Sequence, residues 1–102
     1  MTHKEKRIIF TRNIAELILY AHSMGFMVAE TYCMRCRDCP VGKKNSAHKE
    51  CLAVDLDLYI NGIYKTETED HAPLGKWWQE HGGKWGGDFD DGNHYEFGED
   101  ME

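Results

Sequence analysis

The feature that most constrains the fold of this chain is an alternating stretch between Cys51 and Ile60. Every second position is a large aliphatic residue: Leu52, Val54, Leu56, Leu58 and Ile60. Because successive side chains of a β-strand point to opposite faces, the stretch predicts a strand with one face in the core. Asn61-Gly62 follows directly, and both residues tolerate the positive φ angles of a tight hairpin turn. We expect the chain to return as a partner strand up to Thr66.

A helix is predicted over residues 3–24, ahead of this hairpin. Thr2 and Glu5 have the spacing of a capping box, and the residues up to Met24 include no proline or glycine. Gly25 suits the position just past a helix end, where a left-handed backbone is needed. The next segment, 26–32, is a predicted strand.

The second half of the chain predicts another helix and a last strand. The helix begins near Pro73 and ends at Gly82-Gly83, and the strand covers 94–97. The acidic tail, 98–102, is expected to fray. We therefore predict one domain over residues 1–102 of the α+β class. It consists of a small, mainly antiparallel sheet with two or three helices on one side.

Composition excludes several classes of partner. The 102 residues include 12 lysines and arginines against 18 acidic residues, a formal charge of −6, which argues against a nucleic-acid partner. No apolar run approaches the length of a membrane span, so no membrane partner is expected, and we expect a monomer. The N-terminal residues lack a signal-peptide pattern, which predicts synthesis in the cytoplasm.

Four cysteines cluster before the central strand. They are Cys33, Cys36, Cys39 and Cys51. In a reducing cytoplasm, clustered cysteines indicate a metal or free thiols more than disulfides. The spacing matches an iron–sulfur run poorly, because Pro40 comes too early. A structural zinc and metal-free thiols both stay open.

The candidate chemistry lies in two short motifs. Ser46-Ala47-His48 precedes Ala53-Val54-Asp55, and Asp91-Gly92-Asn93-His94 follows much later. A catalytic zinc takes three protein ligands and leaves its fourth position to water. His48, Asp55 and His94 are the candidate ligands. Asp91, three residues before His94, is the candidate acid/base, with Glu96 as its rival or as a carboxylate that orients an imidazole.

These motifs resemble those of the zinc D-alanyl-D-alanine carboxypeptidase and L-alanyl-D-glutamate peptidase family, closest to its phage endolysin branch. The resemblance runs through residues 46–56, 61–62, 73–75 and 85–87 up to 94–96. It implies a hedgehog/DD-peptidase-like fold and one catalytic zinc held by His48, Asp55 and His94. It also implies Asp91 as the catalytic acid/base. Cys51 departs from the pattern, because the family commonly has glycine there.

The implied activity is hydrolysis of a peptidoglycan stem peptide, favouring the L-alanyl-D-glutamate bond. Such an enzyme would act on the cell wall after release from the cytoplasm. The family also uses an arginine ahead of the S-x-H motif, for which Arg35 is the first candidate and Arg37 the second. Two alternatives stay open: a D-alanyl-D-alanine carboxypeptidase with the same zinc site, and a non-catalytic metal-binding module built on the cysteines.

Two residues near the motifs, Ser46 and Trp85, have secondary roles in this interpretation. Ser46 is expected to order its loop or bind substrate, because a zinc site needs no serine nucleophile. Trp85, between the catalytic segment and a pair of glycines, is a candidate for the cleft wall. The remaining histidines are expected at the surface or in helices: His3, His22, His71 and His81.

Overall fold

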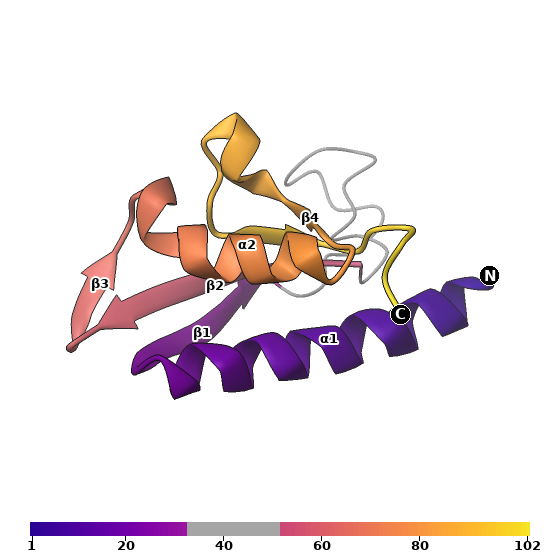
Figure 1. Cartoon of the computed structure of the whole chain (residues 1–102), viewed down its shortest axis with the longest axis horizontal. Helices are drawn as coiled ribbons and strands as arrows, with labels where there is room; N and C mark the ends of the chain where they lie inside the picture. The colour runs from indigo at the N-terminus through magenta and orange to yellow at the C-terminus, as the bar shows by residue number, and fades with distance from the viewer. Residues whose placement is uncertain (33–51) are drawn as a thin grey trace.

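The computed structural model describes residues 1–32 and 52–102 (Figure 1). The intervening segment, 33–51, contains several of the predicted site residues. The predictions for Cys33, Arg35, Cys36, Arg37, Cys39, Ser46, His48 and Cys51 therefore lie outside the described residues.

Helix α1 (His3–Ser23) and strand β1 (Phe26–Tyr32) form the N-terminal part of the molecule. The predicted capping box is present, since the Thr2 hydroxyl accepts from the Glu5 amide and the Glu5 carboxylate accepts from the Thr2 amide. Gly25 turns the chain from α1 into β1 at a φ of 81°. Both elements were predicted from the sequence, and both predictions are confirmed.

Strand β2 (Ala53–Ile60) is the centre of the sheet. It pairs with β1 along one edge, and all pairings in the described sheet are antiparallel. Its other edge is shared by two short strands, β3 (Ile63–Lys65) near its end and β5 (His94–Glu96) near its beginning. Strand β4 (Lys84–Trp85) pairs with β5 and completes a five-stranded sheet in the described part of the chain. The hairpin turn at Asn61 and Gly62 has φ angles of 54° and 78°, as predicted.

Two short 3₁₀ turns flank the second helix and the final strands. Turn η2 (Thr68–His71) runs straight into α2 (Ala72–Glu80), whose second residue is Pro73. Gly82 ends this helix at a φ of 88°. Turn η3 (Gly86–Phe89) lies between β4 and β5. Only short connections separate these elements along the chain.

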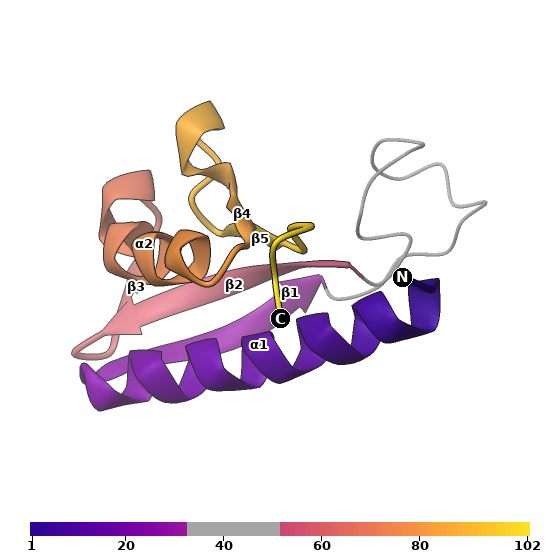
Figure 2. The same cartoon turned by 45° about the vertical axis from the view of Figure 1, so that its right-hand side comes forward.

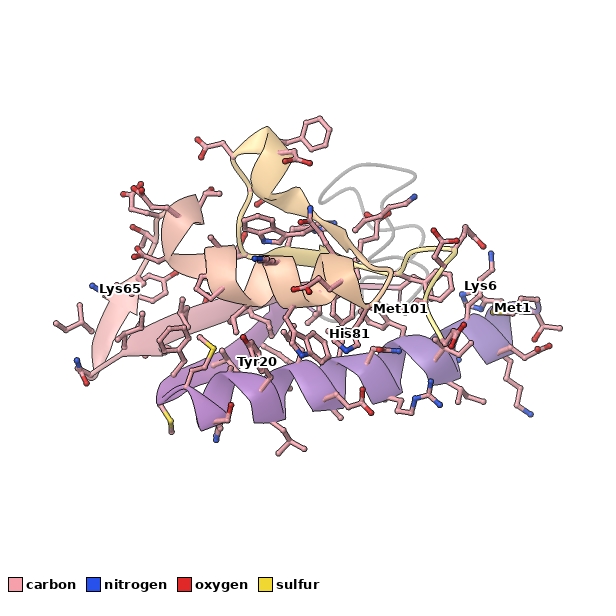
Figure 3. The ribbon with its side chains drawn as sticks, in the orientation of Figure 1. Met1, Lys6, Tyr20, Lys65, His81 and Met101 are labelled. Carbon is pink, nitrogen blue, oxygen red and sulfur yellow. The ribbon has the colours of Figure 1, made fainter. Side chains whose placement is uncertain are left out.

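Helices α1 and α2 contact each other and pack against the same buried face of β2. Figure 2 shows α1 running alongside β1. The core between them contains the predicted aliphatic face of β2, with Leu56 and Leu58 fully buried, and the fully buried Leu17 and Trp78 from the helices. Tyr20 of α1 and His81, both labelled in Figure 3, each stack on the ring of Trp77 in α2. The α+β architecture predicted from the sequence is therefore confirmed.

One prediction about an individual segment was wrong. The acidic tail does not fray, because Met101 is 2% exposed in the core and the Asn13 side chain donates to the Glu102 carbonyl over 2.9 Å. His71, which was expected at the surface or in a helix, lies in η2, where it is 2% exposed and its ring bonds the Tyr95 hydroxyl over 2.8 Å. In residues 1–32 and 52–102, no helix has the length and apolar character needed to cross a bilayer.

Candidate active site

The site is built where β2 and β5 run side by side. Asp55 and His94 are direct partners in the antiparallel register, which places their side chains on the same face of the sheet. This is the face opposite the helices, because Asp55 alternates with the buried Val54 and Leu56. The Asp55 Oδ1 and His94 Nδ1 atoms are 3.3 Å apart, with only 16% and 20% of the two side chains exposed. Two of the three predicted metal ligands therefore lie together.

Glu96 lies on the other side of the His94 ring. Its Oε1 atom is 3.0 Å from His94 Nε2, and its Oε2 atom is 4.0 Å from Lys84 Nζ on β4. Glu96 is two residues beyond His94, so the alternation of β5 places both side chains on one face. The arrangement matches the sequence-based alternative in which Glu96 orients an imidazole. A carboxylate on the distal nitrogen fixes the ring and makes the other nitrogen a better ligand.

The two carboxylates change the protonation of His94. The hydrogen bond with Asp55, and after it the one with Glu96, raises the pKa of His94 to about 9, while burial of the ring opposes the shift. Without a metal, the imidazole is therefore protonated at neutral pH and donates from both nitrogens. A metal has to displace the proton on Nδ1, so metal binding at this site releases a proton.

The distance between Asp55 and His94 fits a zinc ion bound between them. With zinc–ligand bonds of about 2.1 Å and tetrahedral angles, two ligand atoms lie about 3.4 Å apart. The Oδ1 and Nδ1 atoms are already separated by 3.3 Å. The described residues supply two ligands of such a site and no more. Among residues 1–32 and 52–102, no group of three or more His, Cys, Asp and Glu side chains is arranged to hold a metal.

Asp91 lies in the turn that leads into His94. Its amide donates to the Gly86 carbonyl over 2.9 Å, and its own carbonyl accepts from the His94 amide over 3.1 Å. The side chain is exposed and lines a hollow of about 190 Å³ between this turn and the end of the β2–β3 hairpin. The backbone thus connects Asp91 to His94 through one short turn.

Trp85 contacts the turn that carries Asp91 through a hydrogen bond to its backbone. Its indole Nε1 donates to the Gly92 carbonyl over 2.7 Å, and the ring packs against Gly75 and Gly87. A Cβ atom at Gly75 would lie 2.1 Å from the ring, so the glycine makes room for it. The contacts of Trp85 place it under the loop that carries Asp91. Its expected place in the cleft wall stays a prediction.

Sequence reasoning missed two polar residues that hold this region together. Thr68 contacts the acidic turn through its hydroxyl group, and His71 anchors η2 to β5 through Tyr95. Burial lowers the pKa of His71 and raises the pKa of Tyr95, so both groups are neutral at physiological pH. Thr68 and His71 are distant in the sequence from the residues that they contact, so no local motif could identify them.

Strands β2 and β5 lie in a part of the chain that matches a known peptidase family. The sequence profile of a peptidase family described as D-alanyl-D-alanine carboxypeptidase matches residues 41–97, which is more than half of the chain. The matched range includes Asp55, Asp91, His94 and Glu96. The chain belongs to this peptidase family, whose members are typically zinc-dependent hydrolases with the hedgehog/DD-peptidase fold.

No curated protein matches this chain. The family match supports a peptidase acting on peptidoglycan.

Proposed function

We propose that this protein is an endolysin-like zinc peptidase that hydrolyses the L-alanyl-D-glutamate bond of peptidoglycan stem peptides. The observation that carries the proposal is the pairing of Asp55 and His94 on adjacent strands, with their ligand atoms 3.3 Å apart. This pair lies inside the range that matches the peptidase family. His48, just ahead of β2 in the sequence, is the proposed third ligand.

The zinc would contribute the chemistry that the side chains lack. When bound, it lowers the pKa of water toward neutrality and polarises the scissile carbonyl group. Asp55 and His94 would hold it from β2 and β5. Glu96 fixes the His94 ring from its far side and keeps Nδ1 directed toward Asp55.

Asp91 is the proposed acid/base. A carboxylate in this position can accept a proton from the attacking water. The same group then delivers this proton to the amine that leaves. Its exposure is consistent with the role, because the substrate must reach it. Arg35, with Arg37 second, is proposed to bind the polarised carbonyl or a substrate carboxylate through paired donors.

A D-alanyl-D-alanine carboxypeptidase is the second candidate, and the description of the matched family favours it. Both activities use the same zinc ligands and the same acid/base. The two activities differ in which peptide bond of the substrate binds next to the zinc ligands and the acid/base. A digest of purified peptidoglycan, followed by mass analysis of the newly formed ends, separates the two.

The L-alanyl-D-glutamate activity would produce new D-glutamate amino termini. Release of terminal D-alanine alone would instead name the carboxypeptidase. No new ends from the zinc-loaded protein would contradict both peptidase assignments.

A metal count separates either peptidase from the metal-binding module built on Cys33, Cys36, Cys39 and Cys51. If the cysteines hold the metal, Cys33→Ser removes all of it and His48→Ala removes none. For the peptidase, His48→Ala removes the catalytic zinc. A second zinc that persists in His48→Ala but is lost in Cys33→Ser would identify the cysteines as a structural site.

A further inference from the structure

Among residues 1–32 and 52–102, no partner fixes the position of the Asp91 carboxylate. Within the described part of the chain, no hydrogen bond or ion pair reaches this side chain, and the residue is exposed. Its place is set by the backbone on either side of it. A group that exchanges protons with a substrate has to be held within a few tenths of an ångström, because misplacement by about 1 Å can cost about a hundredfold in rate.

Thr68 contacts both neighbours of Asp91 through a single hydroxyl group. The Oγ1 atom donates to the Asp90 carboxylate over 3.0 Å and accepts from the Gly92 amide over 3.3 Å. The Gly92 carbonyl is held separately by the Trp85 indole. Both polar groups of the Gly92 backbone are therefore bound by side chains from outside the turn.

The approach of Thr68 to the turn requires a glycine at position 92. A Cβ atom there would lie 2.6 Å from the Thr68 Cα atom, closer than any van der Waals contact allows. Gly92 is buried, and its φ angle is not positive, so close approach is the reason for a glycine. The backbone at Gly92 therefore packs directly against the start of η2.

Thr68 is itself fixed relative to the strand that carries His94. It begins η2, which ends at His71, and the buried His71 ring bonds the Tyr95 hydroxyl on β5 over 2.8 Å. Tyr95 is fully buried and directly follows His94. These contacts connect β5 to η2 through His71, and η2 to residues 90–92 through Thr68. The chain then returns to β5 at His94.

We propose that Thr68 is a positioning residue for Asp91, which it holds in register with His94 by binding Asp90 and Gly92. The inference rests on the proposed function, because it assumes that Asp91 exchanges a proton with the substrate. Thr68 itself touches neither the ligands nor the reacting atoms in this scheme.

The test uses the zinc-loaded full chain and a soluble disaccharide peptide prepared from peptidoglycan. Thr68→Val removes the hydroxyl with little change of shape, Thr68→Ser keeps it, and Thr66→Val is the control at an exposed threonine. We expect Thr68→Val to lower kcat about tenfold or more, with KM and zinc content unchanged. Thr68→Ser should stay within about twofold of wild type, since the hydroxyl remains. A kcat for Thr68→Val equal to that of Thr66→Val would overturn the proposal.

A double variant shows whether Thr68 acts through Asp91. If it does, adding Thr68→Val to Asp91→Asn causes no further loss of kcat. A further loss of about tenfold would mean that the threonine acts independently, and would also overturn the proposal.

Hydrogen exchange of the Gly92 amide in the metal-free protein gives a readout that does not depend on turnover. Exchange should be faster in Thr68→Val and unchanged in Thr68→Ser. If exchange behaves in this way but Asp91→Asn retains full activity, the proposed acid/base is wrong and the positioning role falls with it. If Asp91→Asn is inactive and Gly92 exchange is unchanged in Thr68→Val, the proposed acid/base stands and only the positioning role of Thr68 is wrong.

Discussion

The two faces of β2 are held in place by different means. The face toward the helices presents Val54, Leu56 and Leu58, each at most 1% exposed and packed among side chains from both helices. The opposite face presents Asp55, which is positioned by its pairing with β5 and by the ring of His94. One strand therefore supplies both the core and the candidate site.

The difference shows how a small domain can hold a polar site precisely. The packed face fixes the backbone of β2, and buried Trp78 fixes β5 by donating to the Glu96 carbonyl over 2.9 Å. Phe97 and Leu52 close the strand pair with a further backbone bond of 2.8 Å. The few polar contacts of the site then have only to orient side chains. We expect changes on the polar face to affect chemistry, and changes on the packed face to affect stability.

The largest expected effect is on turnover in His94→Ala. The variant loses a proposed zinc ligand on the polar face, so peptidoglycan hydrolysis should fall to background while the packed face keeps the chain folded. His81→Ala is the matched control, because this histidine is exposed and stacks on Trp77 away from β5. Release of labelled wall fragments measures the effect. Activity in His94→Ala close to that of His81→Ala would remove His94 from the site.

Asp91→Asn should keep zinc and fold but lose most of the turnover. A general base contributes about 10²–10⁴-fold, so kcat should fall by that range. The acidic limb of the pH–rate profile should also weaken, because a general base has to be ionised to accept a proton. A loss smaller than about tenfold would transfer the acid/base role to Glu96. Steady-state kinetics on a soluble peptidoglycan fragment provides both measurements.

Leu56→Ala tests the packed face next to the same site. Removing a fully buried leucine lowers the free energy of unfolding by about 2–5 kcal/mol, because it leaves a cavity. The zinc content and kcat of the folded protein should change little. Denaturant unfolding together with kinetics checks this separation. If kcat fell as far as in Asp91→Asn with no loss of stability, the two faces would not be separable.

The sequence predicted the parts of the fold that depend on local pattern. Alternation placed Asp55 opposite the core, and the hairpin turn and the helix cap follow from the conformational needs of Asn61, Gly62 and Thr2. The juxtaposition of Asp55 with His94 was proposed from donor types and a family resemblance. The structure adds the strand pairing that brings the two residues together.

The remaining features depend on tertiary contacts that have no local signal. Buried His71 is stabilised by Tyr95, which is distant in the sequence, so its neighbours could not reveal its partner. Met101 is buried although acidic residues surround it, because one apolar side chain fills the core next to α1. The contacts of Thr68 with Asp90 and Gly92 likewise exist only once η2 and the turn are folded together.

The smallest expected effect concerns the pH dependence of stability in the metal-free protein. The folded pKa of His94, about 9, lies above the ordinary value of 6.5, because Asp55 and Glu96 favour the charged ring. This contribution to stability is fully present below pH 6.5 and is lost as pH rises through about 9. Thermal unfolding in the presence of a chelator should show wild type losing more stability than His94→Ala over this range. Equal losses in both proteins would contradict the shift.

A zinc titration tests most directly whether Asp55 on β2 and His94 on β5 bind zinc together. Calorimetry on the metal-free protein would compare wild type with Asp55→Asn and with Asp57→Asn, a control two residues along the same strand face. We predict that wild type and Asp57→Asn bind zinc with equal affinity at the catalytic site, and that binding at this site releases a proton. Asp55→Asn should bind it at least tenfold more weakly, by the order of magnitude expected when a ligand is weakened. Equal zinc affinity in Asp55→Asn and Asp57→Asn would contradict the account.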